Sequence, residues 1–113
     1  MGCLFCNILE KKIPADVVYE DEHALAFRDI RPVAPTHVLV IPRKHIAAVH
    51  EVGDDDDAIM GKVVLAARNV ARKLGLEANG YRLVVNDGDQ AGQTVHHLHV
   101  HVLGGRNMSW PPG

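Results

Sequence analysis

The sequence predicts an α+β fold, in which an antiparallel meander sheet of about five strands is combined with one long and one short helix. Two observations lead to this prediction. Residues 58–74 place apolar side chains at the 3.6-residue spacing of an amphipathic helix. Several shorter segments alternate between apolar and polar residues, or are continuously apolar, and are bounded by turn residues, as is typical of β-strands. The connections are short enough for antiparallel pairing in mostly sequential order.

The elements are expected in the following order. Leu4, Ile8 and Leu9 recur at helical spacing and predict a short helix that runs to about Lys11, because Pro14 stops it. Strands are expected over residues 17–20, 23–29, 37–41, 81–85 and 97–103. The proline-containing segment 31–35 predicts a rigid loop before the third strand, which Pro42 ends.

The long helix over residues 58–74 is the clearest element. Its apolar stripe consists of Ile59, Val63, Ala66, Ala67, Val70, Ala71 and Leu74. The four aspartates 54–57 lie at its positive end, the basic residues Arg68, Arg72 and Lys73 lie toward its negative end, and Gly75 follows as a stop. A metal site is an alternative explanation for the aspartates, but helix-end electrostatics accounts for them more simply.

The composition indicates one globular domain. With 113 residues, the chain is long enough for a single core, and we take residues 1–113 as one domain. A net charge of −2 gives no electrostatic reason to expect nucleic acid or an anionic membrane as a partner. No apolar run of membrane-spanning length and no signal peptide is recognisable, so a cytoplasmic protein is expected.

The two cysteines, Cys3 and Cys6, are spaced as Cys-x-x-Cys. In a chain without an export signal, this pair suggests metal binding or redox chemistry more than a structural disulfide.

Three histidines at every second position carry the strongest functional signal. Because side chains alternate along a β-strand, His97, His99 and His101 are expected on one face, with the apolar residues between them on the other. Ordinary surface histidines, or a fortuitous metal-binding patch like an expression tag, are the alternatives, but a tag would be terminal and would lack an apolar alternate face. The pattern therefore indicates a site.

The segment 86–94 precedes this strand and is rich in glycine and neutral polar residues. Glycine allows backbone N–H groups to approach a ligand closely, and Asn86, Gln93 and Thr94 add uncharged polar groups. An ordinary polar hairpin loop is the alternative. Next to a row of imidazoles, the segment favours a phosphate site. There a neutral imidazole can attack phosphorus, and His99 is the best candidate because it has an imidazole on each side.

The segment His97-Leu98-His99-Val100-His101-Val102-Leu103 resembles the histidine triad motif, His-φ-His-φ-His-φ-φ with φ apolar. Segments 29–30, 34–37, 40–45, 84–86 and 92–95 are also similar to the histidine triad family, so the resemblance covers nearly the whole chain. The C-terminal segment 103–113, which ends in Trp110-Pro111-Pro112-Gly113, resembles the histidine triad nucleotide-binding branch.

This resemblance implies an activity and an assembly. The activity is hydrolysis of purine nucleoside 5′-phosphoramidates, such as adenosine 5′-phosphoramidate, to the nucleoside monophosphate (AMP) and an amine. The assembly is a homodimer whose two sheets join into one larger sheet. His99 matches the nucleophile that becomes nucleotidylated, His101 matches a phosphate and leaving-group contact, and His97 completes the triad. His37 resembles a histidine that hydrogen-bonds His97 in a relay; its alternative role is to satisfy a buried backbone group.

The resemblance also implies which residues bind the nucleotide. Asp29 would contact the ribose hydroxyls, and Trp110 would reach toward the site of the partner subunit. The apolar members of the set could instead be plain core, Leu39 above all. The full set is Leu4, Phe5, Ile8, Phe27, Asp29, Ile30, Leu39, Asn86, Gly92, Gln93, Thr94, Val95, His99, His101 and Trp110.

Cys3, Cys6, His45 and His97 match the zinc ligands of many bacterial-type members of the family. Two thiolates and two imidazoles suit tetrahedral zinc, and four protein ligands leave no open position, so such a zinc ion is structural. The nucleotide-binding branch often lacks this cysteine pair, so the chain combines features of both groups. Free thiols that simply pack are the alternative. No organic cofactor is expected.

Two other functions remain open. A dinucleoside polyphosphate hydrolase would share the nucleophile but expel a nucleotide. A nucleotide-binding or scaffold protein with vestigial catalysis would not need a nucleophile between two imidazoles. A redox role for Cys3 and Cys6 is less favoured, because the strand-then-helix context of thioredoxin-like motifs is absent. His23, His50 and His96 are expected to be ordinary residues.

Overall fold

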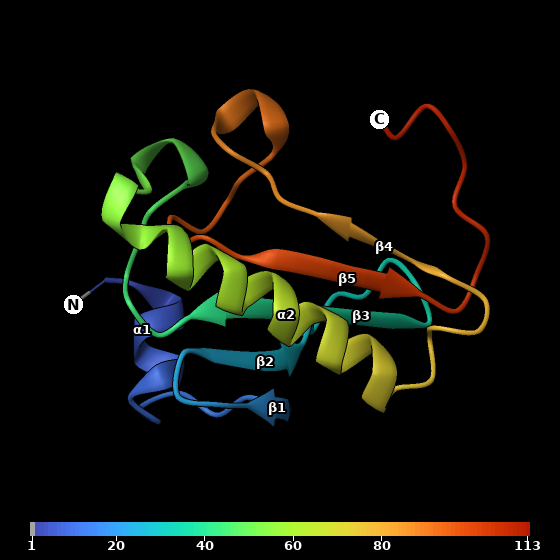
Figure 1. The fold of residues 1–113 in the computed structure, drawn as a ribbon, viewed down its shortest axis with the longest axis horizontal. Helices are drawn as coiled ribbons and strands as arrows, with labels where there is room; N and C mark the ends of the chain where they lie inside the picture. The colour runs from blue at the N-terminus through green and yellow to red at the C-terminus, as the bar shows by residue number, and fades with distance from the viewer. Residues whose placement is uncertain (1) are drawn as a thin grey trace.

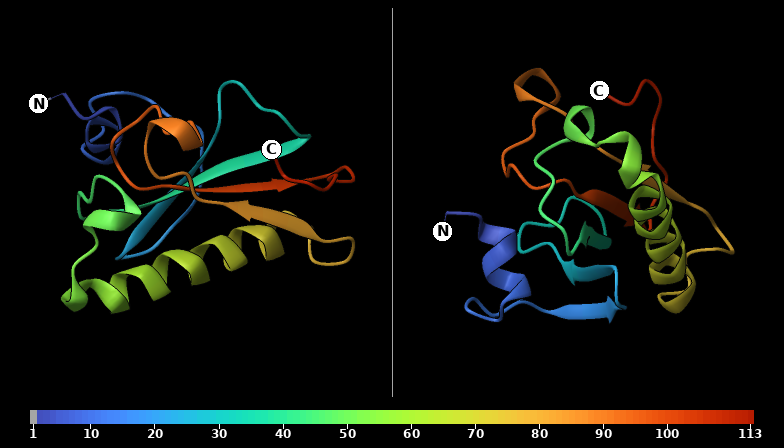
Figure 2. Two further views of the ribbon diagram at one scale, coloured as in Figure 1. Left: turned by 90° about the horizontal axis from the view of Figure 1, so that it is seen from above. Right: turned by 60° about the vertical axis from the view of Figure 1, so that its left-hand side comes forward.

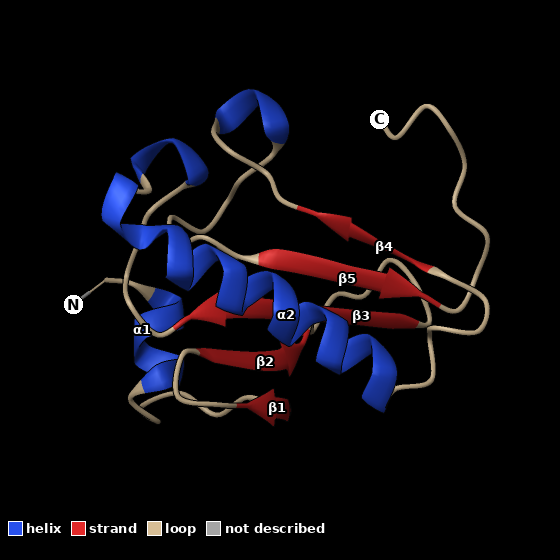
Figure 3. Cartoon of the chain, in the orientation of Figure 1, coloured by secondary structure: helices blue, strands red, loops and turns tan. Residues whose placement is uncertain are grey.

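The computed structural model describes residues 2–113, which form one sheet with a helix on each face (Figure 1). The helices are α1 (Leu4–Leu9) and α2 (Asp57–Lys73), and the strands are β1 (Val17–Glu20), β2 (Ala24–Arg28), β3 (Thr36–Pro42), β4 (Tyr81–Val84) and β5 (Val100–Gly104). Short 3-10 turns occur at Val49–Glu51, Asp54–Asp56 and Asp89–Ala91. The α+β prediction is therefore confirmed (Figure 3).

The strand order is β1-β2-β3-β5-β4, and each neighbouring pair is antiparallel. The prediction of a mostly sequential meander is thus wrong at one point: β5 lies between β3 and β4. The connection from β3 to β4 contains α2, which is long enough to cross the sheet and leave room for one more strand. The last strand then returns beside β3, so the histidine segment lies near the centre of the sheet.

Each face of the sheet has its own apolar core, because side chains alternate along the strands. Val38, Val40, Val100 and Val102 point toward the buried stripe of α2. On the opposite face, Phe5 of α1 packs with Leu25, Phe27, Leu39 and Ile41. The left panel of Figure 2 shows α1 and α2 on opposite sides of the sheet.

The predicted helix and strand boundaries are close to those observed, with two differences. The first helix ends at Leu9 rather than Lys11, which has φ 62° and cannot continue a right-handed helix. The last strand begins at Val100 rather than His97, because β5 pairs with β3 only up to Val100 opposite Val40. Before that point the chain turns away, and the N–H of Leu98 donates to the carbonyl of Ile46 at 2.7 Å.

The aspartate run lies at the start of α2, as predicted. Asp56 precedes the helix and is buried; its carboxylate accepts hydrogen bonds from Lys44 Nζ at 2.8 Å and from the N–H of Gly53 at 3.1 Å. The Lys44 ammonium holds the pKa of this carboxyl below its usual value. Arg72 and Lys73 occupy the last turn. Within residues 2–113, the structure contains no helix of the length and apolarity that a membrane span requires.

Candidate active site

His99 is held in one tautomer by the backbone. Its Nδ1 lies 2.7 Å from the carbonyl oxygen of His97, and a carbonyl can only accept, so Nδ1 carries the proton. The other ring nitrogen, Nε2, therefore has a free lone pair. The ring is buried and lines a cavity, with its centroid 5.0 Å from that of His101 and 5.2 Å from that of Phe5. This is the arrangement that a nitrogen nucleophile needs.

His101 is held in the opposite tautomer by His37. The N–H of Val33 donates to His37 Nδ1 at 3.1 Å, so the proton of a neutral His37 lies on Nε2. That Nε2 lies 2.9 Å from His101 Nδ1 and 3.3 Å from Asp29 Oδ2. Donation from His37 to His101 leaves the His101 proton on its own Nε2, where it can donate to a ligand.

This contact corrects one prediction. His37 hydrogen-bonds His101, whereas the resemblance to the histidine triad family implied a hydrogen bond to His97. The physical reason is the register between β3 and β5: His37 lies opposite Leu103, and Leu39 lies opposite His101, so His37 is near the far end of β5. His97 lies three residues before β5 begins at Val100, beyond the last paired position, so it is too far along the sheet to meet His37.

Burial favours the uncharged form of three imidazoles, those of His37, His97 and His101. Desolvation lowers the pKa of His101 to about 4, and repulsion from His99 and His37 acts in the same direction. Desolvation also lowers the pKa values of His37 and His97 below the usual histidine value. Neutral rings are required for the tautomer assignments above and for nucleophilic attack by nitrogen.

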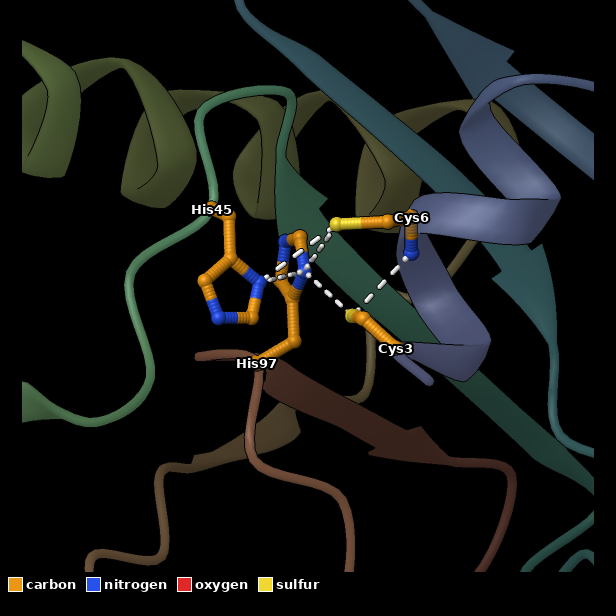
Figure 4. A group of neighbouring side chains, drawn as sticks. All are labelled: Cys3, Cys6, His45 and His97. Atoms are coloured by element: carbon orange, nitrogen blue, oxygen red, sulfur yellow. Dashed lines mark hydrogen bonds between the residues drawn. The ribbon is translucent and has the colours of Figure 1, made fainter. Parts of the chain in front are cut away.

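His97 belongs to a second cluster, with Cys3, Cys6 and His45 (Figure 4). The expected common face therefore holds for His99 and His101, while His97 lies in the turn before β5 and points its Nδ1 toward the thiols. The ligand atoms of the four side chains lie within 4.8 Å of one another, although they come from α1, from the loop after β3 and from the turn before β5.

The cluster has the geometry and chemistry of a tetrahedral metal site. Nδ1 of His97 lies 3.3 Å from Cys3 Sγ, 3.6 Å from Cys6 Sγ and 3.1 Å from His45 Nδ1. Metal–ligand bonds of ~2.0 to ~2.3 Å at tetrahedral angles place ligand atoms roughly 3.3–3.8 Å apart. The Nε2–H of His97 donates to the carbonyl of Pro42 at 2.9 Å, so its Nδ1 lone pair faces the other three ligands.

The surroundings of the cluster disfavour the charged form of the Cys6 thiol. Burial, together with the neighbouring Cys3 thiol, raises the pKa of Cys6 to about 11. A divalent cation would reverse this, because metal binding requires and stabilises the thiolate. The four residues therefore fit zinc.

A cavity of about 620 Å³ lies between α1, β2 and the histidines. Its lining includes eleven of the residues that the family resemblance predicted to bind the nucleotide: Leu4, Phe5, Ile8, Phe27, Asp29, Ile30, Leu39, Thr94, Val95, His99 and His101. The sequence reasoning missed part of the wall, namely Ile13, Pro14, Ala15, Asp16, Arg28 and Arg31. These residues lie in irregular segments or at a strand end, so no periodic pattern marks them.

Asp29 occupies the side of this cavity next to the histidines. Its Oδ1 accepts the N–H of Arg31 at 2.8 Å, and its Oδ2 is the atom near His37. Asp29, His37 and His101 are close enough to hold a metal ion. However, the His37 atom that faces the other two residues is Nε2, which carries a proton and has no lone pair for a metal. The group is therefore a hydrogen-bond network.

Gln93 is buried and does not point its amide toward the cavity. Its Nε2 donates to the carbonyls of Ala47 and Val95 at 2.7 and 3.1 Å, and its Oε1 accepts the N–H of Gly88 at 3.0 Å. The expected phosphate contact through this side chain is thus replaced by a structural role, because all its amide groups are used to shape the loop 88–95. Gly92 belongs to the same loop and does not line the cavity.

A second cavity, of about 580 Å³, also has His101 in its wall. Asn86 lies here, together with Arg82, Arg106 and residues of the C-terminal segment. Trp110 lines neither cavity of this chain: it is 80% exposed, with its ring 6.0 Å from the Arg82 guanidinium carbon. Its predicted role toward a partner subunit stays a prediction.

Comparison with known proteins agrees with this geometry. The HIT domain profile matches residues 10–108. An uncharacterized HIT-like protein of Synechococcus elongatus is 49% identical over 110 residues, which cover 97% of this chain and 96% of that protein. A HIT family hydrolase from Legionella pneumophila has a TM-score of 0.96 and 54% identity, covering 99% of this chain and 100% of its own. A histidine triad nucleotide-binding protein from Candida albicans has a TM-score of 0.83 and 31% identity, covering 97% of this chain and 83% of its own. The chain therefore belongs to the HIT family.

Proposed function

We propose that this protein hydrolyses purine nucleoside 5′-phosphoramidates through a covalent nucleotidyl-His99 intermediate. One observation carries the proposal: the carbonyl of His97 holds the proton of His99 on Nδ1, which leaves the Nε2 lone pair to face a cavity of about 620 Å³. The hydrolase and nucleotide-binding names of similar proteins support the same reaction class.

The reaction follows from these groups in two displacements. His99 Nε2 attacks the α-phosphorus, the phosphorus–nitrogen bond to the amine breaks, and the amine leaves with one proton taken from the solvent, which the attacking water of the second step returns. Positive charge on the nucleotidylated imidazole is stabilised by the Nδ1–H donated to His97. Water then attacks phosphorus and displaces His99, so the net reaction consumes one water and yields the monophosphate and the amine.

His101 supplies the donor that this reaction requires. Its Nε2–H is free to donate to a non-bridging phosphate oxygen, because Nδ1 is occupied by His37. The apolar wall formed by α1, Phe27 and Leu39 suits a purine, and Asp29 offers a carboxylate to the ribose hydroxyls. Thr94 and Val95 line the same cavity at the loop that precedes the histidines.

Turnover of adenosine 5′-phosphoramidate, measured beside a diadenosine polyphosphate, tests the proposal. We expect the first substrate to release AMP and His99→Ala to abolish release. His96→Ala is the matched control, because His96 is an exposed neighbour outside both cavities. Full activity in His99→Ala, or no turnover of the phosphoramidate by the parent protein, would contradict the proposal.

A dinucleoside polyphosphate is the second candidate substrate, and the second cavity favours it. That cavity adjoins His101, has a volume of about 580 Å³, and carries the guanidinium groups of Arg82 and Arg106. It offers space and positive charge for a nucleotide leaving group. Preference for the diadenosine polyphosphate in the same assay would support this candidate.

We also propose that Cys3, Cys6, His45 and His97 hold a structural zinc ion, since their spacing and the His97 tautomer fit tetrahedral coordination. The ion would neutralise two thiolates and tie α1 to the segment that carries His99. We expect one zinc per chain in freshly purified protein, and its loss with a lower melting temperature in Cys3→Ser. Protein that contains no zinc as isolated would contradict this.

Finally, we propose a homodimer formed through β4. This strand is an edge of the sheet and exposes Leu83, so a second β4 can extend the ladder. Trp110 is exposed and free to contact the partner. Sedimentation of the parent chain is expected to give twice the chain mass, and Leu83→Lys is expected to shift it toward the monomer. A monomer at micromolar concentration in the parent protein would refute the assembly.

A further inference from the structure

The loop 31–35, between β2 and β3, is held by the C-terminal segment of the chain. Arg106 donates from Nη2 and Nε to the carbonyl of Val33, at 3.0 and 3.3 Å. Beside it, Gly105 has φ +92°, and a Cβ there would lie 2.8 Å from Cβ of Pro35. The backbone thus approaches this loop as closely as glycine allows.

The same loop contacts the active site on its other side. The N–H of Val33 donates to His37 Nδ1 at 3.1 Å, and the N–H of Arg31 donates to Asp29 Oδ1 at 2.8 Å. Val33 therefore accepts hydrogen bonds from Arg106 through its carbonyl and determines the His37 tautomer through its N–H.

We propose that Arg106 is a positioning residue, which acts through Val33 and His37 to keep the His101 proton on Nε2. The order of contacts is Arg106 to Val33, Val33 to His37, and His37 to His101. The effect of Arg106 on catalysis rests on the proposed function of His101, whereas its effect on the His101 tautomer does not depend on that function.

Asp29 explains why the position of Val33 matters. Asp29 Oδ2 lies 3.3 Å from His37 Nε2 and competes with His101 Nδ1 at 2.9 Å for the same proton. If the loop moves, His37 either turns its donor toward Asp29 or takes the other tautomer. In both cases His101 Nδ1 loses its donor, and the ring is free to place its own proton on Nδ1.

A purely structural role makes a different prediction. Arg106 also donates from Nη1 to the carbonyl of Asn107 at 3.1 Å, so it helps to shape the C-terminal segment. If that were its whole contribution, its loss would lower the melting temperature without changing the imidazole tautomers.

The test uses full-length Arg106→Ala and Arg106→Lys, with Arg72→Ala as the control. Arg72 pairs with Glu77 at the end of α2 and lies outside both cavities. Nitrogen-15 NMR of the histidine rings reports each tautomer directly, and steady-state kinetics with adenosine 5′-phosphoramidate reports kcat and KM separately.

We expect Arg106→Ala to remain folded and to convert His101 from one tautomer to a mixture. Because deletion of an oxyanion donor costs roughly 100- to 1,000-fold in kcat, partial loss of this donor predicts a fall of about three- to tenfold, with KM little changed. Arg106→Lys, which keeps the charge and one donor, is expected to restore most of the Nε2–H form, and Arg72→Ala is expected to match the parent.

Each outcome separates the two proposals. An unchanged His101 tautomer and unchanged kcat in folded Arg106→Ala would overturn the positioning role and leave the function of His99 intact. A shifted tautomer in a protein that turns over no phosphoramidate would support the positioning role and contradict the proposed function. If Arg106→Ala does not fold, Arg106→Met, which keeps the length of the side chain but has no donor for the Val33 carbonyl, carries the same NMR test.

Discussion

Phe5 connects the stability of the fold with the cavity beside His99, and its truncation makes a sharp prediction. Helix α1 has six residues, too few to be stable alone, and Phe5 is its one buried residue. The ring is 4% exposed and packs edge-on against Phe27, His97 and His99 at centroid distances of 5.3, 5.9 and 5.2 Å. Phe5→Ala removes all three contacts.

The expected loss of stability can be worked from these contacts. Burial of a phenylalanine side chain contributes ~1.5–3 kcal/mol, and each aromatic pair adds ~0.5–1.5 kcal/mol. Measured Phe→Ala losses in cores are ~3–5 kcal/mol. Because Phe5 also lines the open cavity, water can enter the space it leaves, so we expect the low end, about 3 kcal/mol.

Thermal unfolding and nucleotide kinetics together test this prediction. A loss of about 3 kcal/mol corresponds to roughly 10 °C in melting temperature for a domain of this size. KM for adenosine 5′-phosphoramidate is expected to rise as well, because α1 forms one wall of the cavity. Leu4→Ala is the matched comparison: Leu4 lines the cavity but is 44% exposed, so it should raise KM with little effect on melting. A Phe5→Ala protein that melts within about 1 °C of the parent would show that α1 is not part of the cooperative fold, and the reasoning would fail.

Three further predictions concern pH, the loop 88–95 and the proposed metal. The folded-state pKa of His101 is lowered from 6.5 to about 4, so the unfolded chain binds more protons than the folded chain between these values. The free energy of unfolding is therefore highest above pH 6.5, and the change at His101 lowers it by up to roughly 3 kcal/mol as the pH drops to about 4. The lowered pKa values of His37 and His97 act in the same direction. Urea unfolding at pH 7, 6 and 5 measures this, and a flat profile would contradict it. Gln93→Ala removes three hydrogen bonds made by a buried side chain and is expected to cost about 2–4 kcal/mol in thermal unfolding, whereas exposed Gln90→Ala should cost little. A chelator is expected to lower the melting temperature of the parent protein but not that of Cys6→Ser; equal effects on both would place the metal elsewhere.

Local patterns were sufficient to predict the elements and much of the cavity. The apolar stripe over residues 58–74 predicted α2 and its buried face, since helical periodicity depends only on neighbours along the chain. The alternation of histidine with apolar residues placed Val100 and Val102 in the core and His99 and His101 on the other face. Resemblance to a family supplied the cavity residues that come from distant segments.

Other features depend on contacts between segments far apart in the sequence, and only the tertiary structure decides them. The position of β5 between β3 and β4 follows from the crossover through α2, and it pairs His37 with His101 instead of His97. The proton positions on His99 and His101 are set by a backbone carbonyl and by the Val33 N–H, which no side-chain pattern encodes. The inward turn of Gln93 likewise depends on the carbonyl of Ala47 in another loop. Periodicity fixes the direction of a side chain from its own strand or helix, whereas its hydrogen-bond partner is fixed only when the whole chain has folded.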